Sequence, residues 1–215
     1  MNNLVIIGAG GFGREVAWLA ERINQIKPTW NILGFVDDAE KLHGSIVGSY
    51  PVLGGTEWLL EHKNDVFAVC SIGASKTRKD VVNKLDGVKF ATLIDPSVII
   101  SDRVRIGEGS IICAGTIITV DIVIGSHNII NLDCTVGHDA VLKNFVTLYP
   151  SVNISGNTIL GECVEMGTGS QIIQGIEIGN NTIVGAGAVV VKDLPSDCTA
   201  VGVPAKPIKF NIPID

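Results

Sequence analysis

A strict six-residue period in the second half of the sequence constrains its fold more than any other feature. Small or β-branched residues often follow each periodic residue by four positions, and Gly, Asn, Asp or Ser recur at the positions between. The latter types tolerate the positive φ angles of tight corners. Each hexapeptide is therefore predicted to form a short strand and a turn of a parallel β-helix. The periodic residues are Ile94, Ile100, Ile106, Ile112, Ile118, Ile124, Ile130, Val136, Leu142, Leu148, Ile154, Leu160, Met166, Ile172, Ile178, Val184 and Val190.

The first 93 residues follow a different pattern. Apolar strand-like runs alternate with segments whose apolar residues have helical spacing, and this order predicts a small parallel sheet. We expect strands within 3–10, 30–38 and 65–73, and helices within 11–24 and 75–85, the second opened by a Ser75 cap. The sequence thus predicts two domains: an α/β Rossmann-like domain over residues 1–93, and a β-helix domain with a C-terminal tail over residues 94–215.

Composition excludes several classes of function. The chain has 16 Lys and Arg against 22 Asp and Glu, and the acidic excess falls in residues 94–215, which argues against nucleic-acid binding. It has no apolar run long enough for a membrane span, and its N-terminus lacks the features of a signal peptide, so a cytoplasmic location is expected. The five Cys are scattered without a CxxC pair, which fits neither a disulfide framework nor a zinc site.

A glycine-rich segment, Gly8–Gly13, joins the first predicted strand to the first predicted helix and matches GxGxxG. Its glycines let backbone N–H groups and the helix N-terminus approach a phosphate. Asp37 and Asp38 follow the second strand, where an acidic side chain commonly meets a ribose hydroxyl. NAD is disfavoured, because a dinucleotide site needs two mononucleotide halves and this segment supplies one. The spacing alone fits a nucleotide site and a ligand-free strand–helix turn equally well.

His138 is one of four histidines, and the six-residue register places it at a corner. It lies two residues after Val136, so its side chain is expected to point out of the β-helix rather than into the core. Gly156 lies one coil of 18 residues further on and is expected to leave room for a ligand. An outward imidazole beside the carboxylate of Asp139 is suited to accept a proton. An unused surface histidine is the alternative.

An ordered set of motifs along nearly the whole chain resembles the NeuD/PglD family of sugar acetyltransferases. These motifs are "VIIGAGGFGREV", "GFVDD", "SIG", the uninterrupted hexapeptide array, "GHD", "VGAGAVVVKDLP" and "GVPAK". The resemblance implies a left-handed parallel β-helix and an acetyl-CoA-dependent acetyltransferase. It also implies a homotrimer whose N-terminal domain binds a nucleotide-linked amino sugar or a sialic-acid-like acceptor.

The resemblance also assigns site residues. The family's catalytic histidine falls on His138 and its acidic partner on Asp139. Contacts to the nucleotide sugar fall on Gly10, Gly11, Phe12, Asp37, Asp38 and Gly73. Contacts to acetyl-CoA fall on Gly156, Thr168 and Ala186, together with Thr147. Two residues depart from the family pattern, since Thr147 stands where some relatives have a second histidine, and Phe12 replaces a polar residue of some members.

We predict N-acetylation of a nucleotide-linked amino sugar, with O-acetylation of sialic acid or a similar sugar as the alternative. A zinc enzyme like the β-helix carbonic anhydrases is disfavoured, because the β-helix holds only His127 and His138, on different faces. No metal is expected. A non-catalytic scaffold that senses a ligand through the glycine-rich segment is the remaining rival.

Overall fold

The computed structural model describes residues 1–210, which form two compact units. The first unit comprises residues 1–96 with 108–111, and the second comprises residues 97–107 with the chain from 112 onward. The domain boundary placed after residue 93 stays a prediction. Within residues 1–210, no helix is both long and apolar enough to cross a bilayer. The cytoplasmic location also stays a prediction.

The first unit contains a four-stranded parallel sheet in the order β2-β1-β5-β6, as its strand–helix pattern predicts. The strands are β1 (Asn2–Ile7), β2 (Trp30–Val36), β5 (Phe67–Cys70) and β6 (Lys89–Phe90). Helix α1 (Gly11–Ile26) buries one face through Val16, Leu19 and Ala20. The remaining elements are η1 (Glu40–Leu42), the hairpin of β3 (Ile46–Val47) and β4 (Tyr50–Pro51), α2 (Glu57–Glu61) and α3 (Ser75–Asn83).

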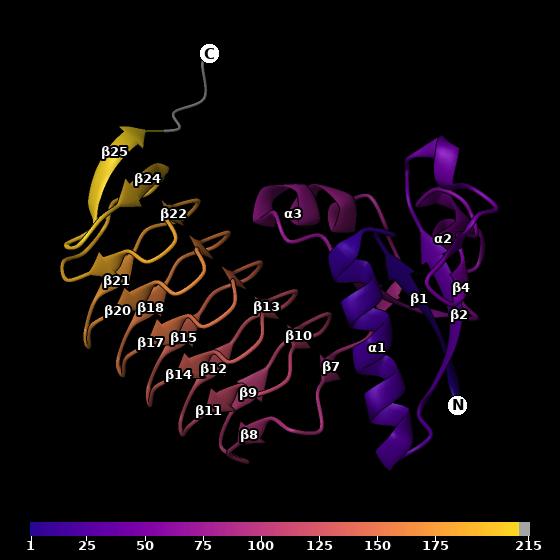
Figure 1. The fold of residues 1–215 in the computed structure, drawn as a ribbon, viewed down its shortest axis with the longest axis horizontal. Coiled ribbons are helices and arrows are strands. Elements are labelled where there is room, and N and C mark those ends of the chain that lie inside the picture. The colour runs from indigo at the N-terminus through magenta and orange to yellow at the C-terminus, as the bar shows by residue number, and fades with distance from the viewer. Residues whose placement is uncertain (211–215) are drawn as a thin grey trace. The chain divides into compact units, whose positions relative to one another are not determined.

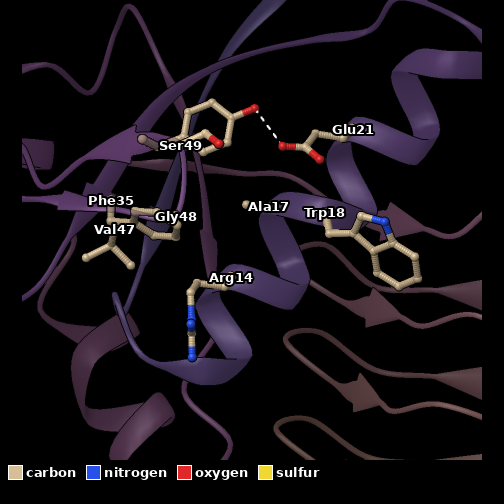
Figure 2. Close-up of a pocket in the computed structure, with 9 residues that line it drawn as sticks. Arg14, Ala17, Trp18, Glu21, Phe35, Val47, Gly48 and Ser49 are labelled. Atoms are coloured by element: carbon tan, nitrogen blue, oxygen red, sulfur yellow. Dashed lines mark hydrogen bonds between the residues drawn. The ribbon is translucent and has the colours of Figure 1, made fainter.

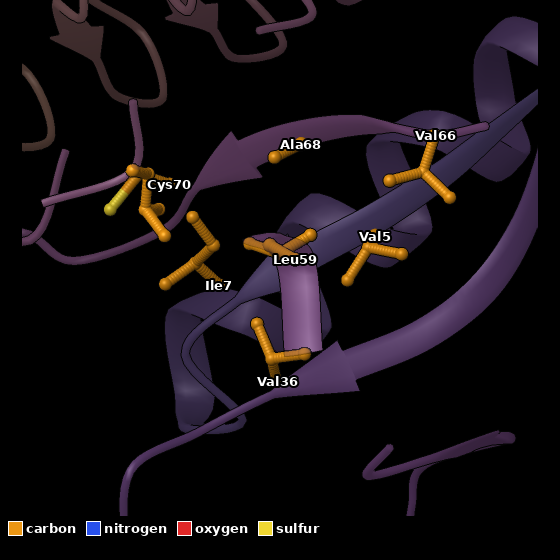
Figure 3. Packing of buried hydrophobic residues seen from close by; sticks show 8 residues of the cluster. Val5, Ile7, Val36, Leu59, Val66, Ala68 and Cys70 are labelled. Atoms are coloured by element: carbon orange, nitrogen blue, oxygen red, sulfur yellow. The ribbon is translucent and has the colours of Figure 1, made fainter. Parts of the chain in front are cut away.

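One hydrophobic cluster of this unit forms where alternate residues of the central strands meet a short helix. Figure 3 shows Val5 and Ile7 of β1 beside Val36 of β2, with Leu59 of α2 among them. All four side chains are at most 1% exposed. This packing fixes the carboxyl end of β1, which the glycine-rich segment follows, and that of β2, which Asp37 follows.

One prediction about this unit is wrong. Ser75 does not cap α3: the helix starts at Ser75, the N-cap residue is Ala74, and no side chain caps the helix. Ser75 is instead fully buried within the first turn. A serine before a helical pattern favours a cap only when its own backbone stays outside the helix, and here the helix begins one residue earlier than the sequence suggests.

The hexapeptide array forms a parallel β-helix, as predicted (Figure 1). Between residues 93 and 190, strands of two residues follow one another every six residues and stack into three sheets. The first sheet contains β7 (Leu93–Ile94), β10 (Ile111–Ile112), β13 (Ile129–Ile130), β16 (Thr147–Leu148), β19 (Glu165–Met166), β22 (Ile183–Val184), β24 (Cys198–Val201) and the antiparallel β25 (Lys206–Phe210).

The other two sheets contain only two-residue strands. The second consists of β8 (Ile99–Ile100), β11 (Ile117–Ile118), β14 (Thr135–Val136), β17 (Asn153–Ile154), β20 (Gln171–Ile172) and β23 (Val189–Val190). The third consists of β9 (Arg105–Ile106), β12 (Val123–Ile124), β15 (Val141–Leu142), β18 (Ile159–Leu160) and β21 (Glu177–Ile178). Strands pair in register 18 residues apart, as Thr135 with Asn153 and Val136 with Ile154.

The corners between these strands have the backbone that the sequence pattern predicts. The third residue after a periodic aliphatic residue repeatedly takes a positive φ, including Asp121, Asp133, Asp139 and Asn157. Asp and Asn tolerate this left-handed conformation better than most residues. The corner sequence therefore determines where the chain turns, and with it where corner side chains such as His138 project.

Candidate active site

The backbone of His138 and Asp139 is fixed by the coils on either side. The residues lie at the corner between β14 and β15. The His138 carbonyl oxygen accepts a hydrogen bond from the N–H of Asn157 at 2.7 Å, and the Asp139 N–H donates to the carbonyl of Val120 at 3.2 Å. Asp139 has φ of 59°. The corner is thus held by hydrogen bonds to both neighbouring coils.

The two side chains form a hydrogen-bonded pair. His138 Nδ1 lies 2.8 Å from Asp139 Oδ2, and the side chains are 53% and 59% exposed. A carboxylate only accepts hydrogen bonds, so in the neutral ring Nδ1 carries the proton and Nε2 carries the lone pair. Within the described part of the chain, Nε2 has no hydrogen-bond partner. The pair therefore presents an accessible basic nitrogen.

Gly156 lies against the face of this imidazole. A Cβ on Gly156 would come within 2.6 Å of His138 Cε1 and Nε2. The sequence led us to expect that Gly156 leaves room for a ligand beside the histidine. That expectation is wrong in one respect, because the histidine ring itself occupies the space. Gly156 therefore accommodates the ring of His138. Its assignment to acetyl-CoA stays a prediction.

The other residues assigned to acetyl-CoA lie elsewhere on the β-helix. Thr168 and Ala186 are exposed and occupy neighbouring coils of the corner that follows the first sheet, where the Gly187 N–H donates to the Thr168 carbonyl at 2.9 Å. Thr147 lies in β16 and is 1% exposed. Within the second unit these positions and His138 do not form one cluster, and their roles remain predictions.

The glycine-rich segment has the tight geometry that its sequence predicts. Gly8 has φ of 97°, and a Cβ on Gly13 would overlap the carbonyl oxygen of Gly8. A Cβ on Gly10 would meet nothing within 4 Å, and one on Gly11 would meet only Arg14. Gly8 and Gly13 are thus needed for the turn and for close helix packing, whereas Gly10 and Gly11 border open space.

The predicted acidic pair, Asp37 and Asp38, accepts hydrogen bonds from the loops near Gly10 and Gly11. Asp37 accepts hydrogen bonds from the N–H of Ala9 and from that of Ala39, each at 2.9 Å, one on each carboxylate oxygen. Asp38 accepts one from the N–H of Thr56 at 2.8 Å and is exposed. The structure therefore brings Asp37 to the glycine-rich segment, and it leaves Asp38 the freer of the two carboxylates.

Two bracing residues were missed by sequence reasoning. The hydroxyl of Ser71 donates to the carbonyl oxygens of Ile7 and Gly8 at 2.6 and 3.1 Å, tying β5 to the glycine-rich segment. Arg78 is fully buried, and its Nη1 donates to the carbonyl of Gly73 at 2.9 Å. For Ser71, the sequence offered one indication, namely a polar residue directly after an apolar run, in "SIG". For Arg78 it offered none. An arginine in a helix is usually exposed.

The cysteines and the possible metal-ligating residues were also located in residues 1–210. All five cysteines are free and buried, and burial raises the pKa of Cys70 and of Cys134 to about 11. Such thiols are poor nucleophiles, since the thiolate is the reactive form. Across residues 1–210, no three His, Cys, Asp or Glu side chains gather in a group that could hold a metal ion. His127 is 6% exposed and its ring stacks on Phe145.

Comparisons with known proteins agree with this architecture. The PglD N-terminal domain family matches residues 3–85. GDP-perosamine N-acetyltransferase of Escherichia coli O157:H7 is 32% identical over 218 aligned positions, covering 97% of each chain. PerB from Caulobacter crescentus, in a crystal structure with CoA and GDP-perosamine, is 33% identical, has a TM-score of 0.89, and is matched over 97% of this chain and 98% of that one.

A further solved structure extends the likeness. The acetyltransferase domain of PglB from Neisseria gonorrhoeae FA1090, in complex with acetyl coenzyme A, is 34% identical, with a TM-score of 0.86 over 97% of this chain and all of that one. Each of these matches spans both the α/β unit and the β-helix of this chain. The chain therefore belongs to the NeuD/PglD family of sugar acetyltransferases.

Proposed function

We propose that this enzyme transfers the acetyl group of acetyl-CoA to the amine of a nucleotide-linked amino sugar, with His138 as the general base. The observation that carries the proposal is the 2.8 Å contact between His138 Nδ1 and Asp139, which leaves Nε2 unpartnered within the described residues, on a side chain that is 53% exposed. Relatives of matching length that bind CoA and GDP-perosamine support the choice of both substrates.

The proposed reaction is a direct transfer. The lone pair of the sugar amine attacks the thioester carbonyl carbon, the new C–N bond forms, and the C–S bond to CoA breaks. Nε2 of His138 takes the proton that the nitrogen loses. The imidazolium then returns this proton to the departing CoA sulfur, which leaves as the thiol. The Asp139 carboxylate holds Nδ1–H and stabilises the imidazolium that forms. No covalent acyl-enzyme is needed, which fits the burial of every cysteine.

We assign the acceptor to the first unit. The proposed contacts are Gly10, Gly11, Phe12, Asp37, Asp38 and Gly73, which surround the carboxyl ends of β1, β2 and β5. The open space at Gly10 and Gly11 supports this, since backbone and helix N-terminus there can approach a phosphate. For acetyl-CoA, the proposed contacts are Thr147, Gly156, Thr168 and Ala186.

Product analysis tests the function directly. The enzyme should release free thiol from acetyl-CoA when GDP-perosamine or another nucleotide-linked amino sugar is added, and the sugar should gain one acetyl group by mass spectrometry. The matched control is the same nucleotide linked to a sugar without an amine. Resistance of the product to mild base identifies an amide, whereas a labile product would support the O-acetylation alternative. Absence of turnover across the panel would support the non-catalytic scaffold.

We further propose that the protein is a homotrimer assembled through the β-helix. Apolar side chains on an outer face support this, because Ile99 and Ile117 are paired neighbours on β8 and β11 and are 66% and 39% exposed. Adjacent exposed apolar side chains such as these are suited to pack against another subunit. Light scattering should give three times the chain mass at micromolar concentration, and a monomer under those conditions would contradict the proposal.

A further inference from the structure

Arg14 is a positively charged residue with no role in the proposed acetyl transfer. It lies in the first turn of α1, directly after the glycine-rich segment, and it is exposed. Within residues 1–210 its side chain has no hydrogen bond and no ion pair. An arginine at a helix N-terminus is also disfavoured by the helix dipole, which attracts negative charge there. Its placement is therefore poorly explained by stability alone.

The side chain reaches back to the glycine-rich segment. Nη2 of Arg14 lies 3.9 Å from the position that a Cβ on Gly11 would take, and its Cγ lies 4.0 Å from the corresponding position of Gly48. Gly48 belongs to the turn between β3 and β4. Arg14 thus passes beside the hairpin and ends at the open space bordered by Gly11.

A small cavity of about 110 Å³ lies along the same helix face, lined by residues that include Arg14, Trp18, Glu21 and Tyr50. Figure 2 shows the guanidinium of Arg14 extending away from Glu21. The Glu21 carboxylate already accepts a hydrogen bond from the Tyr50 hydroxyl at 3.0 Å. The acid of this cavity is therefore not the partner of Arg14, and the guanidinium lies near Gly11 of the glycine-rich segment instead.

Backbone donors face the same space. No side chain caps α1, and the N–H groups in the first turn of any helix lack an intrahelical acceptor. Such N–H groups bind one phosphate well. A guanidinium fork beside them provides charge-assisted donors for a second phosphate. The arrangement matches two linked phosphates better than one.

We propose that Arg14 binds the second phosphate of the acceptor, so that the enzyme selects sugars linked through a nucleoside diphosphate over those linked through a monophosphate. This inference rests on the proposed nucleotide-sugar function and narrows its substrate class. Sialic acid activated through a single phosphate would leave Arg14 unpaired. Arg14 is here a specificity-determining binding residue and takes no part in proton transfer.

Calorimetry with matched nucleotide pairs tests the inference. GDP and GMP, and then UDP and UMP, are titrated into the wild-type enzyme and into Arg14→Gln. For the base that binds, we expect Arg14→Gln to weaken diphosphate binding by about 10- to 100-fold, the loss expected for charge-assisted hydrogen bonds. Monophosphate binding should change little, which also shows that the variant is folded.

Two further variants sharpen the test. Lys27→Gln removes the same charge from an exposed position just beyond the other end of α1 and should leave the diphosphate preference intact. Arg14→Lys should retain part of the preference. Equal diphosphate affinities for wild type and Arg14→Gln would overturn this inference alone. Failure of the wild type to bind either diphosphate would overturn it together with the proposed acceptor class.

Discussion

The imidazole of His138 rests on the backbone of Gly156, in the next coil of the β-helix. A Cβ added to Gly156 would be 2.6 Å from both Cε1 and Nε2 of the ring, closer than side chains pack. The same two coils are joined by the hydrogen bond from the Asn157 N–H to the His138 carbonyl at 2.7 Å. Glycine at this position therefore permits the ring orientation that pairs Nδ1 with Asp139.

Gly156→Ala should lower kcat by about 10- to 100-fold, since a methyl group displaces the ring and misplacing a reacting group by about 1 Å can cost 100-fold. Steady-state assays with acetyl-CoA and a nucleotide-linked amino sugar measure this. The control is the same substitution in a His138→Ala background, where no ring is left to displace. At saturating acetyl-CoA, kcat there should equal that of His138→Ala alone. A further loss in that background would show that Gly156 acts through something other than the ring.

Gly13→Ala should destabilise the protein by about 1–3 kcal/mol, the usual range for overpacking a buried site. Its Cβ would overlap the Gly8 carbonyl, and backbone cannot move aside as a flexible side chain can. Gly10→Ala is the matched control, because its Cβ meets nothing within 4 Å and its φ of −79° suits alanine. Thermal unfolding should show a lower Tm for Gly13→Ala only. Equal Tm values for the two variants would refute this account of the turn.

Much of the fold can be predicted from the sequence because every hexapeptide of the β-helix has the same pattern of inward-facing and corner residues. From Ile112 onward, each periodic aliphatic residue is buried as the second residue of a two-residue strand. Ile94, Ile100 and Ile106 are only partly buried. They belong to β7, β8 and β9, which end their sheets and pair on one side. A period locates the inward face, but burial also depends on neighbours that a period does not specify.

Only part of the candidate site could be predicted from the sequence. The register placed His138 at an outward corner, and the structure confirms its exposure. The contact with Gly156 was missed, because the rotamer of a corner side chain depends on three-dimensional surroundings. Likewise, the acidic residue after β2 suggested a ribose contact for Asp37, yet its oxygens accept hydrogen bonds from Ala9 and Ala39. Such tertiary hydrogen bonds cannot be predicted from the spacing of residues in the sequence.

Thiol-directed reagents should leave the native enzyme active. All five cysteines are buried, and the pKa of about 11 for Cys70 and Cys134 leaves almost no thiolate at pH 8. Iodoacetamide should label none of the five under native conditions and all of them in denaturant, as read by mass spectrometry. Rapid native labelling accompanied by loss of acetyl transfer would instead indicate a cysteine with a functional role.

Alkaline pH should lower the stability of the fold. Burial raises the pKa of the Cys70 and Cys134 thiols from 9.0 to about 11, so between these values the unfolded chain releases protons that the folded chain retains. The free energy of unfolding therefore falls as pH rises through this window. Tm measured from pH 8 to pH 11 should decline most above pH 9, and Cys134→Ala should show a shallower decline. An unchanged slope in that variant would remove Cys134 from the explanation.

His138→Ala should reduce kcat by about 10²- to 10⁴-fold, the usual contribution of a general base. The side chain is 53% exposed, so its loss should leave Tm and the KM for acetyl-CoA nearly unchanged. A base must be unprotonated to act, so wild-type kcat/KM should fall toward acidic pH, and this limb should be absent in His138→Ala. Asp139→Asn should cost less, because an amide oxygen still accepts from Nδ1–H and only the charge is lost. A His138→Ala enzyme within a few-fold of wild-type activity would show that another group, or water, takes the proton.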